Sequence, residues 1–265
     1  MPINEDRCRL SNAADDPFSA GVMLDFQLVV PAYNESKTLT HIIERFRVAA
    51  TAAGFTSSEV QLVVVENGSS DDSARVLADL QKSADSPWFS VVNVPVNRGY
   101  GYGIQMGLRA TTGRYVGWSH ADMQCEPADA FRALKLLRES GTQGNSLVKG
   151  RRFGRALRER IVSRLFEFLA RVILGVKVNE MNAQPKVFSR ALLDQIENPP
   201  DTFAFDLYVL FRAAKSRYQV LTVDVAYPPR IHGLSNWAGH FASRYKTIFG
   251  IVRYMWALRS SEGRI

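Results

Sequence analysis

Apolar residues in this chain gather in short runs that alternate with longer segments of helical periodicity. The runs rich in β-branched and aromatic residues predict strands at 26–31, 59–66, 88–94 and 114–119. Between and after them, the pattern predicts helices at about 36–53, 71–84, 100–112 and 128–140. Near-continuous apolar strands separated by helices are typical of a mostly parallel sheet that is covered on both faces. The helix at 71–84 carries a start signal, since Ser70 offers a cap and two aspartates follow it.

The second half of the chain is less regular. It predicts a strand at 147–153 that runs into an arginine-rich loop, a helix at 156–176, a short strand at 186–188, a helix at 203–217, a strand at 218–228, a loop at 228–237 and a last helix at about 239–258. The fold class expected is α/β, with C-terminal amphipathic helices added to the sheet. We expect a loosely ordered tail at 1–24, a main domain at 25–237, and a helix and tail at 238–265.

Composition narrows the class of protein. The 265 residues are 46% hydrophobic, which excludes a mostly disordered or fibrous chain. The net charge of +7 favours partners that carry negative charge, such as nucleic acid, anionic lipid or phosphorylated small molecules. Cys8 and Cys125 stand far apart, which argues against a disulfide framework or a structural zinc site and favours a reducing compartment.

The sequence also bears on location. No apolar run approaches the roughly 18 to 20 residues of a spanning helix. The first 24 residues lack the apolar core of a signal peptide and carry Glu5, Asp6, Asp15 and Asp16. We therefore expect a cytoplasmic protein.

Polar residues follow each of the first four predicted strands. They are Ala32-Tyr33-Asn34-Glu35, Glu66-Asn67-Gly68-Ser69-Ser70-Asp71, Asn97-Arg98-Gly99-Tyr100-Gly101 and His120-Ala121-Asp122-Met123-Gln124. In an open α/β sheet, ligands bind at the carboxyl ends of the strands. The sequence therefore predicts one polar site along this edge.

Several common site motifs are missing. After Gly101 and Gly103, Met106 occupies the third position of a dinucleotide fingerprint, which disfavours a Rossmann cofactor site. The chain has no GxxxxGK[ST] loop and no GxSxG elbow, and its four histidines show no metal-ligand spacing.

Longer segments match a known family in order and spacing. VVPAYNESKTL (29–39), VVVENGSSDDS (63–73) and NRGYGYGIQMGLRATTGRYVGWSHADMQ (97–124) resemble the family 2 glycosyltransferases, which have the GT-A fold. VKGRRF (148–153), NAQPKVFSR (182–190), FAFDLYVL (203–210) and RIHGLSNW (230–237) are similar to the branch that makes dolichyl- or polyprenyl-phosphate sugars. The resemblance implies transfer of a sugar, with inversion, from a nucleotide diphosphate donor, often to a lipid phosphate at the cytosolic membrane face.

The resemblance implies a metal site at Asp122. The family has an acidic DxD-like motif here, whose carboxylates hold Mg²⁺ or Mn²⁺ against the donor diphosphate. This chain has His120 at the first acidic position, and imidazole is a softer ligand that favours Mn²⁺ or weakens binding. His120 can also contact the diphosphate without a metal. Gln124 is a further candidate for orienting the metal or the lipid phosphate. The alternative for Asp122 is a helix cap before Pro127.

The donor-binding residues that the resemblance implies come from the first four loops: Pro31, Tyr33, Glu35, Glu66, Asn67, Arg98, Gly99, Ala121 and Asp122. Glu66 can accept a hydrogen bond from a uracil or guanine ring N–H, whereas Asn67 replaces a second acid by an amide. Gly99 permits close backbone approach. Arg98 can equally be a surface ion-pair residue, and the others can be turn residues.

For the acceptor phosphate, the candidates are Gln124, Arg151, Arg152, Arg160, Ser163 and Arg230. Arginine presents a planar fork suited to phosphate, and Arg152 and Arg230 match the family positions best. Arg155 and Arg158 are expected to be solvated. Asp206 is the candidate general base if the acceptor is a hydroxyl, and its alternative is a polar helix face.

The helices predicted at 156–176 and 239–258 carry apolar stripes beside basic residues. Such helices can lie in a membrane interface, or their stripes can pack on the protein's own core. The reading that combines these features is a glycosyltransferase peripheral to the cytosolic face of a membrane, with a nucleotide sugar donor and a polyprenyl-phosphate acceptor. Its alternatives are an enzyme acting on a hydroxyl of a glycan or lipid-linked sugar, an inactive copy that binds nucleotide sugar, and a nucleic-acid-binding module. The last is disfavoured because the chain has no RNA-binding aromatic motif or helix-turn-helix signature.

Overall fold

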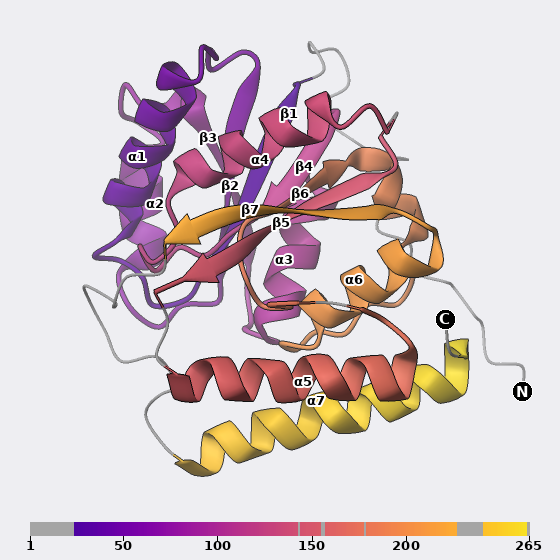
Figure 1. The fold of residues 1–265 in the computed structure, drawn as a ribbon. Helices are drawn as coiled ribbons and strands as arrows, with labels where there is room; N and C mark the ends of the chain where they lie inside the picture. Colours follow the sequence, from indigo (N-terminus) through magenta and orange to yellow (C-terminus); the bar gives the residue numbers. More distant parts are fainter. Residues whose placement is uncertain (1–23, 143, 155–156, 178, 227–240, 264–265) are drawn as a thin grey trace, which may run out of the picture.

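A seven-stranded sheet runs through the molecule, with helices on both of its faces (Figure 1). The computed structural model describes residues 24–142, 144–154, 157–177, 179–226 and 241–263. In the order of the sheet, the strands are β3 (Phe89–Val94), β2 (Val60–Asn67), β1 (Phe26–Ala32), β4 (Tyr115–Trp118), β6 (Lys186–Ser189), β5 (Ser146–Phe153) and β7 (Gln219–Ala226).

Most of the strand pairs are parallel. β1 pairs in parallel with β2 and β4, β2 with β3, and β5 with β7. Only β6, among these strands, runs antiparallel to its neighbours β4 and β5. The predicted α/β fold with a mostly parallel sheet is therefore confirmed.

Both faces of the central strands are buried, which explains their continuous apolar runs. Along β1, Val29 packs into one hydrophobic cluster, while Leu28 and Val30 pack into the cluster on the opposite face. The second cluster includes side chains from α1 (Leu39–Ala52), α2 (Ser73–Leu80) and α4 (Pro127–Glu139). The first includes side chains from α3 (Tyr100–Arg109), α5 (Leu157–Leu174), α6 (Phe205–Lys215) and α7 (Phe241–Glu262). The short 3₁₀ helices are η1 (Ser86–Trp88) and η2 (Arg190–Gln195).

The start of α2 differs from the prediction. The helix begins at Ser73, and its cap is Asp72 rather than Ser70. Ser70 instead donates its backbone N–H to Oδ1 of Asn34 over 2.8 Å. The polar residues that follow β2 therefore form hydrogen bonds with Asn34 in the loop after β1. The helix begins only after these residues.

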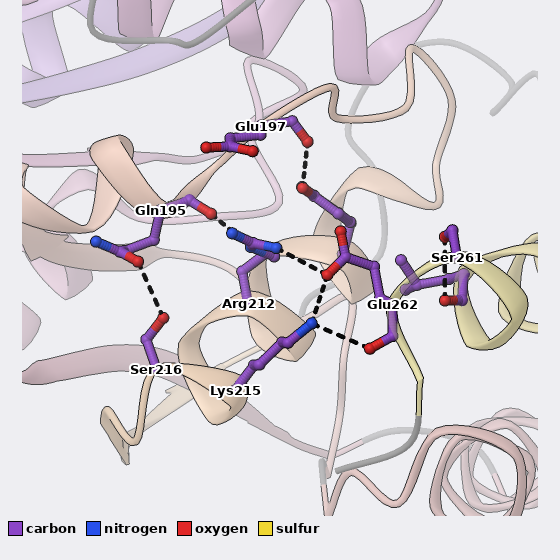
Figure 2. A network of polar contacts seen from close by, with 9 residues as sticks. Gln195, Glu197, Arg212, Lys215, Ser216, Ser261 and Glu262 are labelled. Carbon is purple, nitrogen blue, oxygen red and sulfur yellow. Dashed lines mark hydrogen bonds and ion pairs between the residues drawn. The ribbon is translucent and has the colours of Figure 1, made fainter. Parts of the chain in front are cut away.

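Two long helices, α5 and α7, lie side by side at one end of the molecule (Figure 1). The last turn of α7 is tied to α6 by Glu262, whose Oε2 accepts from Arg212 Nη1 at 3.1 Å and from Lys215 Nζ at 2.5 Å (Figure 2). The hydroxyl of Ser216 donates to Oε1 of Gln195 in the same network. These contacts fix α7 against the helix whose first turn carries Asp206.

None of the helices within the described residues is both long enough and apolar enough to cross a membrane. Residues 1–23 of the tail predicted at 1–24, and the loop predicted at 228–237 with Arg230, lie outside the described residues.

Candidate active site

Asn34 joins the loops that follow β1 and β2. Its backbone is left-handed (φ 57°), a conformation that asparagine tolerates better than most residues. Its N–H donates to the Ser69 hydroxyl at 3.1 Å, and its Oδ1 accepts from the N–H groups of Ser70 and Asp71. This arrangement sets the edge of the sheet where the predicted donor residues begin.

The other ties between these loops come from Asp71 and Glu35. Asp71 accepts the N–H groups of Ser36 and Ser73 at 3.1 and 3.0 Å, so its carboxylate joins the loop after β1 to the start of α2. Burial raises the pKa of Asp71, but the hydrogen bonds from Ser73 and Ser36 outweigh it and leave the pKa below its ordinary value. The Glu35 side chain accepts from Thr38 at 2.9 Å beside the start of α1. Tyr33, in the loop after β1, is exposed.

Pro31, Asn67 and Gly103 meet at the ends of β1 and β2. A Cβ added to Gly103 would lie 2.9 Å from Nδ2 of Asn67 and 3.2 Å from Cβ of Pro31, so glycine permits the close approach. Nδ2 of Asn67 donates to the carbonyl of Gly99 at 3.2 Å, while its buried Oδ1 has no hydrogen-bond partner among the described residues. Glu66, also buried, accepts the N–H of Ser69 at 2.7 Å. The expected donor residues Pro31, Glu66, Asn67 and Gly99 thus lie along one edge.

The start of α3 packs on the loop that precedes α6. A Cβ on Gly101 would lie 2.4 Å from the carbonyl oxygen of Pro200. A Cβ on Gly99, whose φ is 131°, would lie 2.5 Å from the carbonyl oxygen of Asp201. Arg98 pairs with Asp201 at 2.7 Å, which confirms its predicted alternative as an ion-pair residue. This loop carries Phe203, and Asp206 follows it in the first turn of α6.

An aromatic stack connects this loop to the end of β4. The ring of Phe203, an exposed side chain, stacks on Tyr100 with a centroid distance of 5.0 Å and an angle of 16°. Tyr100 in turn lies 5.6 Å from the ring of His120. The Tyr100 ring therefore lies between Phe203, in the loop that leads to Asp206, and His120, which follows β4.

Asp122 lies in a tight, buried turn after β4. The positive φ of Met123 (63°) lets the chain turn back, and the N–H of Gln124 donates to Oδ1 of Asp122 at 3.2 Å. Ala121, Asp122 and Gln124 are all buried. The cap of α4 is Glu126, so the alternative that Asp122 caps this helix is wrong.

Cys125 shows that this turn lies near Arg152. Burial and, to a smaller extent, the Asp122 carboxylate raise the pKa of the Cys125 thiol to about 12. The positive charge of Arg152 acts in the opposite direction on the same thiol. The predicted metal residue and the predicted phosphate residue therefore both lie within electrostatic reach of Cys125.

No group of three or more His, Cys, Asp or Glu side chains that could hold a metal occurs among the described residues. The turn offers one carboxylate, from Asp122, with the imidazole of His120 two residues earlier. Such a donor set fits a hard divalent cation only if a ligand supplies most of the oxygen atoms, as a diphosphate can.

Asp206 lies at the centre of a buried polar cluster. Its Oδ1 accepts from Nε1 of Trp118 at 3.2 Å and from Nε2 of Gln184 at 3.1 Å, and it forms an ion pair with Lys186. Burial lowers the pKa of Lys186, although the Asp206 carboxylate opposes this effect. Nε2 of Gln184 also donates to the Tyr100 hydroxyl, whose pKa is raised by burial and by Asp206. The alternative of a polar helix face is not what the structure has, because Asp206 is buried among the apolar residues of α6.

The predicted phosphate residues occupy different environments. Nε of Arg152 donates to Oε2 of Glu180 at 2.7 Å, and both side chains are largely buried. Arg151, by contrast, forms an exposed bidentate pair with Asp224 at 2.5 and 2.9 Å. Arg160 and Ser163 lie on α5, where Arg160 is exposed. Within the described residues, Arg152 is the arginine of this set that borders the buried cluster.

Sequence reasoning did not single out several residues of this cluster, among them Lys149, Glu180, Gln184 and Lys186. Two of them were visible in the sequence, since Lys149 lies within a predicted strand and Lys186 begins one. A buried lysine needs partners, and those partners come from distant segments that the pattern does not connect.

The model of the family described as "Glycosyl transferase family 2" matches residues 27–197. Among curated proteins, an undecaprenyl-phosphate 4-deoxy-4-formamido-L-arabinose transferase from Pseudomonas syringae pv. syringae is 30% identical over 169 residues, 63% of this chain and 48% of that protein. One of the same name from Pseudomonas fluorescens is 27% identical over 213 residues, 80% of this chain and 59% of that protein. The chain thus spans about half the length of the curated relatives that it matches.

Solved structures share the fold. Mannosyl-3-phosphoglycerate synthase from Rubrobacter xylanophilus has a TM-score of 0.68 at 21% identity, covering 91% of this chain and 76% of the other. Glucosyl-3-phosphoglycerate synthase from Mycobacterium tuberculosis, in complex with Mn²⁺, UDP-glucose and phosphoglyceric acid, has a TM-score of 0.64 at 22% identity, covering 88% and 80%. At these identities the likeness shows the fold alone, and it is the GT-A type expected from the sequence.

Proposed function

The chain belongs to glycosyl transferase family 2, and from that premise we propose that it moves a sugar, with inversion, from a nucleotide diphosphate donor to a polyprenyl phosphate. The donor half of the proposal is supported by the converging loops at the ends of β1, β2 and β4. The acceptor half is supported by the relatives that are named undecaprenyl-phosphate sugar transferases, and by one surface of the chain itself.

That surface is the outer face of α5, and it carries the proposal. Ile161, Leu165, Phe168 and Val172 recur at helical spacing and are all exposed, so they do not pack on the core. Arg160, Arg164 and Arg171 lie exposed along one border of this stripe. An apolar stripe beside a row of arginines matches an anionic lipid surface, which takes apolar side chains below its headgroups and attracts cations above them.

The neighbouring helix α7 extends the surface. Phe249 and Trp256 are exposed, whereas Ile251, Met255 and Leu258 on the same helix pack into the core. We propose that α5 and α7 together, which lie side by side in Figure 1, form a lipid-facing side of the protein, so that it acts as a peripheral protein at the cytosolic face of the membrane.

In the proposed donor site, Glu66 and Asn67 bind the base, with Pro31 and Tyr33 beside the base and ribose and Glu35 and Ala121 at the border. Oδ1 of Asn67, which has no partner within the part of the chain that the structure describes, is a hydrogen-bond acceptor that a ring N–H can satisfy. Arg98 and Gly99 lie along the path of the donor. Uracil and guanine both present such an N–H, so the proposal covers UDP- and GDP-sugars.

Asp122 would hold Mg²⁺ or Mn²⁺, with His120 or Gln124 beside it and diphosphate oxygens completing the ligand set. Bound there, the cation would neutralise charge on the departing nucleoside diphosphate. Among the structural neighbours, one is named as a complex with Mn²⁺ and UDP. Its likeness to this chain supports the fold, and the chemistry of Asp122 supports the ion.

The reaction is a displacement at the anomeric carbon. An oxygen of the acceptor phosphate forms a bond to that carbon from one side, and the bond to the diphosphate oxygen breaks on the other, which releases the nucleoside diphosphate. The acceptor phosphate is already ionised, so no general base is required, and positioning with electrostatic stabilisation suffices. In this scheme Arg152, with Arg151, Arg160, Ser163, Arg230 and Gln124 as further candidates, binds phosphate. Asp206 would serve as a base only for a hydroxyl acceptor.

The test is turnover by the purified chain. UDP- and GDP-sugars are supplied with Mg²⁺ or Mn²⁺, and each is assayed with a short polyprenyl phosphate, with the corresponding polyprenol and with 3-phosphoglycerate. Release of UDP or GDP that depends on the polyprenyl phosphate, with formation of the lipid-linked sugar, is the expected result. Turnover with a hydroxyl acceptor alone overturns the acceptor and favours the alternative within the family. Donor binding without turnover for any acceptor favours an inactive copy.

A further inference from the structure

We infer that Glu180 is a positioning residue that aims Arg152 at phosphate, an inference that rests on the proposed function. The carboxylate of Glu180 accepts from Nε of Arg152 at 2.7 Å. The exposed fractions of the two side chains are 15% and 10%, so solvent screens the pair little. A hydrogen-bonded ion pair between arginine and a carboxylate fixes the orientation of the guanidinium plane as well as the position of its charge.

The backbone of Glu180 is itself held in an unfavourable conformation. Its φ of 50° lies in the left-handed region, which costs free energy for a residue with a Cβ. Such a conformation persists only where the surroundings fix it, and it is frequent at functional sites. Here residues of α5 and β5 fix it, so the strain is part of how this loop is built.

Each polar group of Glu180 has a partner from a different position in the fold. Its N–H donates to Oε1 of Glu167 on α5 at 2.7 Å, and its carbonyl accepts from Nζ of Lys149 on β5 at 3.1 Å. Its carboxylate accepts from Nε of Arg152, near the end of β5. The loop between α5 and β6 is thereby fixed at the residue that contacts Arg152.

The consequence is a direct path from the outer helix to the site. Glu167 lies on α5, whose other face presents the apolar stripe Ile161, Leu165, Phe168 and Val172 to solvent. A shift of α5 would move Glu180 and, through it, Arg152. Because Arg152 is held through Glu180, a displacement of α5 would change how its guanidinium is presented to phosphate.

The experiment compares Glu180→Gln and Glu180→Asp with Arg152→Gln and with the double variant Glu180→Gln/Arg152→Gln. Glu180→Gln should lower kcat with polyprenyl phosphate by about 10- to 100-fold and raise the KM for that acceptor. The affinity for UDP or GDP, measured by calorimetry, should stay within a factor of about two. Glu180→Asp, which keeps the charge, should recover part of the activity. If Glu180 acts through Arg152, the double variant should lose no more than Arg152→Gln alone.

Glu262→Gln is the matched control. It removes a carboxylate that is also partly buried and also binds an arginine, but between α6 and α7 (Figure 2). It should lower thermal stability and leave kcat unchanged. Wild-type kinetics in Glu180→Gln, or losses that add in the double variant, would overturn the inference.

A second readout separates this inference from the proposed function. Affinity for farnesyl phosphate and for inorganic pyrophosphate is measured by calorimetry for the same variants. If the wild type turns over no lipid phosphate, the proposed function fails. The inference then stands only if Glu180→Gln and Arg152→Gln weaken binding of either probe equally and without additivity. Unchanged binding in Glu180→Gln sinks it.

Discussion

Lys149 and Lys186 lie directly opposite each other on β5 and β6, and both side chains are buried. Lys186 forms an ion pair with Asp206, whereas Lys149 donates to the carbonyl oxygens of Gly150 and Glu180 at 2.9 and 3.1 Å. Burial, and then the charge of Lys186, lower the pKa of Lys149 to about 7. Lys186 therefore has a paired carboxylate, whereas Lys149 is held by backbone carbonyls and has a lowered pKa, so the stability of this buried layer depends on pH.

The first prediction concerns stability against pH in Lys149→Met. The folded pKa of Lys149, about 7, lies below the ordinary value of 10.5. Between these pH values the unfolded chain binds more protons, so the free energy of unfolding of the wild type should rise with pH relative to the variant. The slope should reach at most about 1.4 kcal/mol per pH unit and vanish below pH 7. Urea denaturation at a series of pH values measures it.

Lys135→Met is the control for this slope, because the Lys135 side chain is 77% exposed. It should show no comparable dependence on pH. A constant difference between the wild type and Lys149→Met from pH 7 to pH 10 would contradict the lowered pKa.

The second prediction separates two roles for Asp206. Asp206→Asn keeps an oxygen acceptor for Trp118 but leaves the charge of buried Lys186 uncompensated, at a cost of about 3–5 kcal/mol in the free energy of unfolding. Adding Lys186→Gln should restore at least about 1 kcal/mol, since the two substitutions are coupled. Partial recovery of turnover in the double variant marks Asp206 as a positioning residue. Restored stability without any turnover would instead favour a direct chemical role.

The elements of the fold were predictable because each follows from local pattern. The run FQLVVP indicated a buried strand, which is β1, and α3 begins at Tyr100, as the sequence indicated. The helix boundaries were less predictable. α1 starts at Leu39 rather than 36, because the backbone N–H groups of Glu35 and Ser36 donate to side chains that follow β2. Such ties join residues more than thirty positions apart, and periodicity does not encode them.

The site was predictable in part. The polar residues after β1, β2 and β4 gave the position of the edge, because strand ends meet there in any parallel sheet. The buried residues that position the site were not predictable. Glu180 has no distinguishing motif, and its role depends on Lys149, Arg152 and Glu167 meeting in three dimensions. The amphipathic pattern of α5 likewise fitted both a core and a lipid surface until its exposure was known.

The third prediction tests how closely α3 packs on the loop before α6. In Gly101→Ala the new Cβ would meet backbone oxygens of Pro200 and Thr202 at 2.4 and 2.7 Å, so the loop must move. We expect a loss of about 1–3 kcal/mol in the free energy of unfolding, with reduced turnover, because Phe203 and Asp206 follow this loop. Gly250→Ala, on α7, meets nothing within 4 Å and should stabilise the protein by up to about 1 kcal/mol. Equal effects of the two substitutions in chemical denaturation would contradict the packing.

The fourth prediction concerns Asp122. Asp122→Asn preserves the shape of the buried turn and the acceptor for the N–H of Gln124, but it removes the charge that a divalent cation requires. Turnover should fall by at least about 100-fold, and the apparent affinity for Mn²⁺ in the assay should fall with it. Glu126→Gln, which removes a nearby carboxylate from a surface pair with Arg45, is the control and should retain wild-type turnover. Full activity in Asp122→Asn would remove Asp122 from the site.

The last prediction tests the lipid-facing surface. Phe168 is 62% exposed in the stripe that α5 presents to solvent, and burial of such a side chain in a bilayer interface contributes about 1.5–3 kcal/mol. Phe168→Glu should therefore weaken binding to vesicles that contain anionic lipid by about 10-fold or more, through lost burial and added repulsion. Val48→Glu is the matched control, because Val48 is an exposed apolar residue on α1, which contributes to the hydrophobic cluster on the other face of the sheet. Cosedimentation with vesicles, at low and high salt, measures both variants.

Equal binding by Phe168→Glu and the wild type would mean that the stripe serves another partner. In that case the kcat of Phe168→Glu with a water-soluble, short-chain polyprenyl phosphate would show whether the stripe affects the site at all.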